Sequence, residues 1–147
     1  MNRRIAIIIF MHTLIVGCSS ISGMQSQVDT MNRQLESNYS PVRAKLTNFD
    51  GGATGLQVGV WAGESGDTVF HEKQQELIFE NIEKHCGYKK ESLYEVRVVR
   101  YTETQWYEVW VFNNPESKRE DKKSGVSVLV RFNPQTQLTQ TSFPAGC

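Results

Sequence analysis

The cysteine and histidine side chains are the groups in this 147-residue sequence whose types could support covalent or metal chemistry. His85 directly precedes Cys86, but neighbouring helix residues point about 100° apart, so the two side chains do not face each other as a thiol and its base. His71, His85 and scattered carboxylates lack the spacing that a zinc site uses. The sequence also contains no nucleophile elbow and no phosphate-binding loop. We therefore expect a protein that is not an enzyme and that holds no metal or other cofactor.

The first 17 residues have the pattern of a segment that is removed from the mature protein. Met1-Asn2-Arg3-Arg4 is cationic, and the mostly apolar run from Ile5 to Val16 ends abruptly in small residues and Cys18. A transmembrane helix needs about 20 apolar residues, so this run is too short to be one and indicates a signal peptide. The alternative is an ordinary signal peptide or short anchor in which Cys18 is incidental.

The sequence Ile15-Val16-Gly17-Cys18 resembles the lipobox of bacterial lipoprotein precursors, with Ile15 where Leu is commoner. This resemblance implies cleavage after Gly17, a diacylglycerol on the Cys18 thiol and a fatty acid such as palmitate on the new amine. Two or more acyl chains anchor a protein stably to a membrane. Ser19 follows where an Asp would signal retention in the inner membrane, so the resemblance implies an outer-membrane protein that faces the periplasm.

If Cys18 carries lipid, the two remaining cysteines are Cys86 and Cys147. An even pair in an oxidising compartment predicts a disulfide. Such a bond would close a long loop and add roughly 4 kcal/mol of stability in the chain-entropy model. The alternative is two free thiols.

Apolar residues at heptad spacing follow the candidate anchor and predict a short helical stalk. This seam comprises Ile21, Met24, Val28, Met31 and Leu35. The segment weakly resembles the heptads of the Braun-type major outer-membrane lipoprotein, although the chain lacks the C-terminal lysine by which that family attaches to peptidoglycan. We expect residues 18–50 to form a lipid-anchored helical tether. Its seam either packs on the protein's own domain or joins copies of the chain into a homo-oligomer.

The end of the predicted tether is marked by two features. Pro41 allows a second helix to begin, with Val42 and Leu46 as its apolar pair. The glycine-rich cluster that follows, residues 48–55, predicts the boundary to the globular part.

Residues 51–147 predict a small α+β domain. Alternation over residues 56–62 indicates a half-buried strand, and helical spacing over residues 69–86 indicates a helix that Asp67 or Thr68 caps and Gly87 ends. Four further strands are expected at residues 93–101, 106–112, 126–132 and 138–143. Because short loops join them, we expect an antiparallel β-meander sheet with one helix packed on it.

Three aromatic side chains share one face of the strand over residues 106–112 and form the candidate partner-binding surface: Trp106, Trp110 and Phe112. The alternative, which the size of these side chains favours, is that they pack inward against the helix or the stalk.

The charges bear on the class of partner. The 16 basic residues balance the 16 acidic ones, which disfavours a nucleic-acid binder that is recognised by charge. We expect a non-enzymatic lipoprotein that binds another envelope protein as an accessory, assembly or stabilising subunit of a secretion, pilus or flagellar apparatus. The alternative is an inhibitor or immunity lipoprotein that presents a loop such as residues 113–125 to a hydrolase or toxin. A binder of small ligands or glycans is a third.

Overall fold

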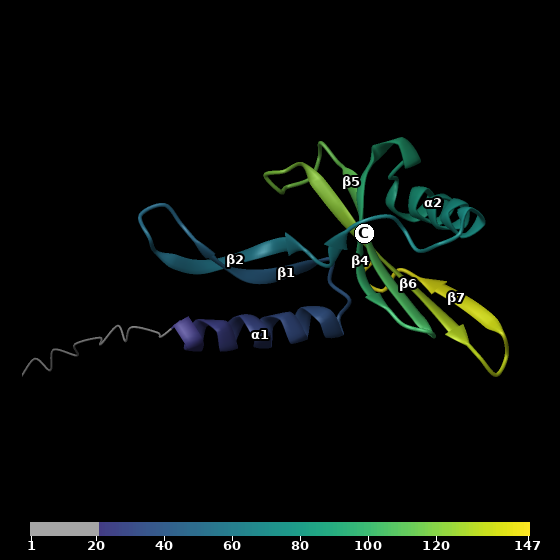
Figure 1. The fold of residues 1–147 in the computed structure, drawn as a ribbon. Coiled ribbons are helices and arrows are strands. Elements are labelled where there is room, and N and C mark those ends of the chain that lie inside the picture. Colours follow the sequence, from purple (N-terminus) through teal and green to yellow (C-terminus); the bar gives the residue numbers. More distant parts are fainter. Residues whose placement is uncertain (1–20) are drawn as a thin grey trace, which may run out of the picture.

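The computed structural model describes residues 21–147, so the predicted signal peptide and Cys18 lie outside the described residues. Figure 1 shows two parts, an elongated arm and a sheet that carries a helix. The arm consists of α1 (Ile21–Ser37), β1 (Val42–Asn48) and β2 (Thr54–Trp61). The second part contains β3 (Glu64–Ser65), α2 (Glu72–Cys86), a 3-10 turn at Lys90–Ser92, β4 (Leu93–Tyr101), β5 (Gln105–Asn113), β6 (Lys123–Asn133) and β7 (Leu138–Ser142).

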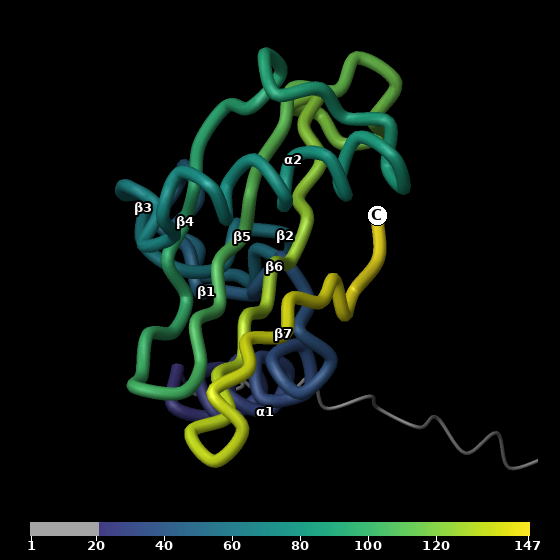
Figure 2. Tube along the Cα trace, turned by 90° about the vertical axis from the view of Figure 1, so that its right-hand side faces the viewer, coloured from purple at the N-terminus to yellow at the C-terminus, as the bar shows by residue number. Residues whose placement is uncertain are grey.

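The strands from β3 to β7 form one antiparallel sheet in the order β3-β4-β5-β6-β7. Each strand pairs with its neighbour in sequence, so the predicted α+β architecture with an antiparallel meander is confirmed. The strands are rich in Val, Tyr and Trp, which fit a pleated and half-buried surface. In Figure 2 these strands run side by side, with α2 in front of them and the arm behind.

Helix α2 forms where the apolar residues recur at helical spacing, and it ends at Gly87 as expected. Gly87 adopts the left-handed conformation at φ 74°, and its N–H donates to the carbonyl of Glu83. The predicted N-terminal cap is wrong, because the helix begins after His71 rather than after Asp67 or Thr68. The His71 N–H donates to Oε1 of Gln74 at 3.3 Å.

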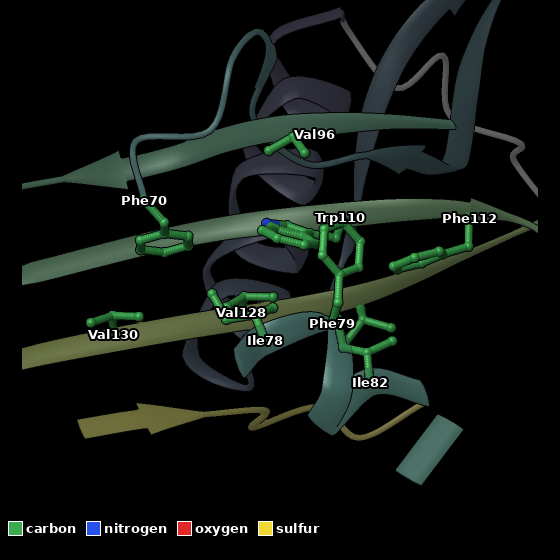
Figure 3. Packing of buried hydrophobic residues seen from close by; sticks show 10 residues of the cluster. Phe70, Ile78, Phe79, Ile82, Val96, Trp110, Phe112, Val128 and Val130 are labelled. Carbon is green, nitrogen blue, oxygen red and sulfur yellow. The ribbon is translucent and has the colours of Figure 1, made fainter. Parts of the chain in front are cut away.

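The face of the sheet beneath α2 holds the larger apolar cluster. Figure 3 shows side chains of α2 meeting those of β4, β5 and β6, with the Trp110 and Phe112 rings between the layers. The Phe79 ring meets the Trp110 ring edge-on at 4.8 Å between centroids. The whole cluster is Phe70, Ile78, Phe79, Ile82, Val96, Trp110, Phe112, Val126, Val128 and Val130.

The opposite face of the sheet is also buried, which the sequence analysis did not anticipate. Ala62, Tyr107, Val109, Val111 and Leu129 form a second apolar cluster there. The segments that enter and leave the arm cover this cluster. The sheet is therefore the middle layer between α2 and the root of the arm.

The second helix predicted from Pro41 onward is wrong, because residues 42–48 form strand β1. Val42 and Leu46 are four residues apart, which fits a helix, but with Ala44 they also alternate as a strand does. Pairing with β2 decides between the two, since Leu46 lies opposite Leu56 and Ala44 opposite Val58.

The predicted boundary at residue 51 falls within the turn of the β1–β2 hairpin rather than between two domains. Residues 42–61 therefore form one unit, and the arm extends beyond the predicted tether. A strand was expected at residues 56–62, which overlaps β2 except at residue 62, but β2 pairs with β1 in a separate sheet. As a result Leu56 and Val58 are exposed rather than half-buried.

Candidate functional site

Helix α1 is fastened along β1 by one asparagine. The Asn32 side-chain amide donates to the carbonyl of Ala44 at 2.9 Å, and the N–H of Ala44 donates back to Asn32 Oδ1 at 2.8 Å. This amide replaces a partner strand at the outer edge of β1, which is one way in which proteins protect an open sheet edge. Val28, in the middle of the predicted heptad seam, is buried, and α1 packs on β1.

The seam thus packs in large part on the protein's own β1. This is the alternative in which the seam packs within one chain. Ile21, at its start, remains 66% exposed. Oligomerisation through the seam stays a prediction.

The joint between the arm and the sheet consists of residues 39–41 and 61–63. Three successive carbonyl groups, those of Tyr39, Ser40 and Pro41, each accept a hydrogen bond. The donors are the Ser127 hydroxyl at 2.6 Å, the Tyr107 hydroxyl at 3.0 Å and the Ala62 N–H at 2.9 Å. Because Tyr107 and Ser127 lie on β5 and β6, the arm is bonded to interior strands of the sheet.

Tyr39 itself occupies a backbone position that usually belongs to glycine. Its φ is 51°, and it ends α1 in a left-handed turn that the Ser40 N–H closes on the Leu35 carbonyl. The contacts of the tyrosine side chain explain why this position holds a residue other than glycine. Its ring packs edge-on against Tyr107 at 5.5 Å between centroids, and its hydroxyl accepts a hydrogen bond from Arg131 at 2.8 Å.

The second strand of the arm is held by packing and by arginines. The Trp61 ring lies over Gly125, where an added Cβ would come within 2.5 Å of the ring. The Arg119 guanidinium covers the ring at 4.1 Å from its centroid and donates to the Gly59 carbonyl at 2.9 Å. Arg97 donates to the carbonyls of Ala62 and Gly63 at 3.1 and 2.6 Å. The arm is therefore a rigid extension of the sheet.

The loop between β5 and β6, residues 114–122, is part of this fastening. Arg119 also pairs with Asp121 at 2.9 Å, which holds the pKa of the Asp121 carboxyl below its usual range. Arg119 thus bonds the loop to the arm, while Pro115, Lys118 and Glu120 remain exposed. The inhibitor alternative stays a prediction.

Glu108 is a buried carboxylate on the same face of β5 as Trp106 and Trp110, and it was not predicted as a site residue. It has no exposed surface, and three groups donate to it: the Thr68 hydroxyl at 2.9 Å, the Val69 N–H at 2.8 Å and the Trp110 indole N–H at 2.7 Å. Burial raises its pKa, and the hydrogen bonds from Val69, Trp110 and Thr68 act in the opposite direction. Because Glu108 is sealed from solvent, it positions the segment before α2 rather than reacting with a substrate.

The aromatic face predicted to bind a partner points inward. Trp110 and Phe112 have no exposed surface, so neither can contact a partner. Trp106 is partly buried and packs against the same cluster. The inward-packing alternative is therefore the one that the structure shows.

Cys86 and Cys147 are joined in a disulfide, with 5.5 Å between their Cα atoms and a separation of 61 positions in sequence. The bond ties the last turn of α2 to the chain terminus beyond β7. Cys18, the predicted site of lipidation, lies outside the described residues.

The edge of the sheet formed by β7 is open, unlike the edge that β3 covers in part. Strand β7 contains no charged residue and no proline, the usual means of blocking an edge. Leu138, at its start, is 68% exposed. A hollow of about 820 Å³ lies beside it and includes Arg131 and Pro134 in its lining. This open edge is the candidate site for a protein partner.

No protein-family model, curated protein or solved structure matches the chain. Within residues 21–147, no group of three or more His, Cys, Asp and Glu side chains is placed to hold a metal ion. Neither α1 nor α2 is long and apolar enough to cross a membrane.

Proposed function

We propose that this protein is a lipoprotein anchored to the outer membrane through Cys18, facing the periplasm. In this proposal it is not an enzyme. It binds another envelope protein as an accessory, assembly or stabilising subunit of an envelope machine such as a secretion, pilus or flagellar apparatus. The lipobox-like sequence before Cys18 supports the anchor, and the Cys86–Cys147 disulfide fits an oxidising compartment.

The observation that carries this proposal is the rigid arm. It begins at Ile21, three residues after Cys18, and its other end is bonded to interior strands of the sheet. The 17-residue helix alone is about 25 Å long. A flexible tether would let the sheet move independently of Ile21, whereas this arm holds the sheet at a set distance and angle from the end of the helix nearest Cys18. A subunit that must meet a partner in a defined geometry requires that property.

The partner is proposed to bind at the open edge of β7. An extended segment of another protein can add to such an edge through backbone hydrogen bonds. The hollow beside Leu138 can accept one of its side chains.

The anchor is tested by replacing Cys18. We expect the wild type to fractionate with outer membranes and to carry fatty acid by mass spectrometry, and Cys18→Ser to be released into the periplasm. Replacing the neighbouring Ser20 by Ala is the control and leaves the protein in the membrane. A Cys18→Ser protein that stays in the membrane contradicts the proposal.

The partner site is tested by photocrosslinking in cells. A photoreactive residue at Leu138 is expected to trap a discrete envelope protein. The same residue at Leu77, an equally apolar and 59% exposed position on α2, is not expected to do so. Equal yields at the two positions, or none at Leu138, would overturn the assignment of β7.

A further inference from the structure

The end of the arm nearest Cys18 is unusually poor in charge. We call this end the tip, and it comprises residues 21–28 and 46–56, where Leu46 and Leu56 lie opposite each other. Asp50 is its one charged residue, although 22% of the whole chain is charged. Ile21, Phe49 and Leu56 are large hydrophobic residues of the tip whose exposed fractions lie between 41 and 66%. The tip therefore presents apolar side chains with almost no charge to desolvate.

The two segments of the tip lie at the same end of the arm. Helix α1 and strand β1 run in opposite directions, and the Asn32 side chain fastens them together at Ala44. The helix spans about 17 Å from Asn32 back to Ile21, and the chain spans about 17 Å from Ala44 to Phe49. The β1–β2 turn consequently lies at the same end of the arm as the start of α1, as Figure 1 shows.

The chain length before α1 limits how far the tip can lie from an anchored cysteine. Cys18 precedes Ile21 by three residues, which reach at most about 10 Å when fully extended. The polar layer on each side of a bilayer is some 5–8 Å thick. A lipid on Cys18 therefore keeps Ile21 within about 10 Å of the anchored cysteine, and an upright arm brings the turn of the hairpin to the headgroups as well.

The turn of the hairpin is already ordered in the protein. The Phe49 N–H donates to the Ala53 carbonyl at 2.8 Å, and the Gly52 N–H donates to the Phe49 carbonyl at 3.1 Å. The Phe49 ring lies against Gly55, where an added Cβ would come within 2.6 Å of it. The aromatic ring is thus held in place at the outermost part of the arm, and little further ordering is needed on contact.

We propose that the tip rests in the headgroup layer of the membrane that holds Cys18, with Phe49 and Leu56 in contact with lipid. This inference rests on the proposed lipidation. The acyl chains supply the affinity, and the tip supplies orientation, so that the arm meets the membrane at two points rather than at one. The bonded joint then sets the direction in which the sheet faces.

The test uses the lipidated full-length protein in vesicles of phosphatidylethanolamine and phosphatidylglycerol. A nitroxide is attached at Ala53→Cys in the tip or, as the distant reference, at Gln135→Cys in the β6–β7 turn. With Cys18 acylated and Cys86 bonded to Cys147, the introduced cysteine takes the label. We expect the label at residue 53 to lose accessibility to a water-soluble nickel chelate several-fold on vesicles, while the label at residue 135 is unchanged.

Substitutions at Phe49 distinguish direct contact of the tip with lipid from mere closeness of the tip to the membrane. Phe49→Asp is expected to restore nickel accessibility at residue 53 without releasing the protein from vesicles, and Phe49→Trp to preserve the protection. Leu77→Asp on α2 is the matched control and has no effect.

Three outcomes would overturn the inference. In the first, the protein floats with vesicles but residue 53 is as accessible as residue 135. In the second, residue 53 is already protected in the soluble Cys18→Ser protein, which would place a second copy of the chain on the tip. In the third, the wild-type protein carries no lipid, and the proposed function fails together with the inference.

Discussion

At the scale of single residues, the sealed carboxylate of Glu108 is the most consequential side chain. Its two oxygens receive hydrogen bonds from Thr68, Val69 and Trp110, so it joins the segment before α2 to the centre of β5. Burial raises its pKa above the ordinary value of 4.5. Its contribution to stability is therefore fully present below that value and is lost as the pH rises through the folded-state pKa.

Glu108→Gln tests this role. The glutamine oxygen can accept from Val69 or Trp110, but its NH₂ group then faces the other donor, whereas a protonated carboxyl retains a lone pair on each oxygen. We expect Glu108→Gln to lower the free energy of unfolding by about 1–3 kcal/mol at pH 4.5. The gap from the wild type should narrow as the pH rises, when measured by urea denaturation.

The control for this substitution is Glu80→Gln on the exposed side of α2. It is expected to leave both the stability and its pH dependence unchanged. A gap for Glu108→Gln that widens from pH 4.5 to pH 8 would contradict a raised pKa.

Alternation along β5 could place Glu108 on the same face as Trp110, but it could not show that this face is buried. Burial depends on α2 packing over that face, and two of the three donors, Thr68 and Val69, lie some 40 positions away in sequence. The sequence did contain one sign that Glu108 is unusual. It is a charged residue between Trp106 and Trp110 on one face of the strand.

At the scale of elements, the spacing of apolar residues predicted α2, because helical spacing continues over several turns. It also predicted the meander strands, because distinct turn residues separate them. It failed for β1, where seven residues satisfy both the helical and the strand period. The deciding contacts are the pairing of Leu46 with Leu56 and the amide of Asn32 on Ala44. Both are tertiary contacts, so the arm could not be derived from the order of its residues.

Gly125→Ala tests the joint between the arm and the sheet. A Cβ at this position would lie 2.5 Å from the Trp61 ring and 3.1 Å from Pro41, so the root of the arm must shift. We expect a loss of about 1–3 kcal/mol in the free energy of unfolding, together with a change in near-ultraviolet circular dichroism.

Gly66→Ala is the matched control, because nothing lies within 4 Å of a Cβ added there. It should leave both measurements close to the wild type. If Gly125→Ala behaves in the same way, Trp61 is not clamped and the arm is less rigid than described.

At the scale of the whole molecule, the disulfide connects the end of α2 to Cys147, beyond β7. In the chain-entropy model, closing a loop of 61 residues is worth about 4 kcal/mol. We expect the double variant Cys86→Ser and Cys147→Ser to unfold at a markedly lower temperature in calorimetry. Wild-type protein treated with reductant should match it, and reductant should not change the variant. Equal melting temperatures for oxidised and reduced wild type would show that the bond adds no stability.

The overall architecture was predictable only in part. The cysteine count predicted a pairing that the structure contains, and turn residues predicted the meander. The sequence did not reveal that the sheet is covered on both faces, because the second cover is the root of the arm. That cover depends on Tyr39 in a left-handed turn, which residue preferences disfavour.

The three bonded carbonyls of Tyr39, Ser40 and Pro41 also determine how the protein carries mechanical load. If a partner pulls on the sheet while acyl chains hold Cys18, the joint passes tension from the arm to the interior strands β5 and β6 as well as along the chain into β3. The disulfide prevents extension of the chain between Cys86 and Cys147. Under the proposed function, the joint therefore resists separation of the arm from the sheet, and the disulfide resists extension of the chain beyond α2.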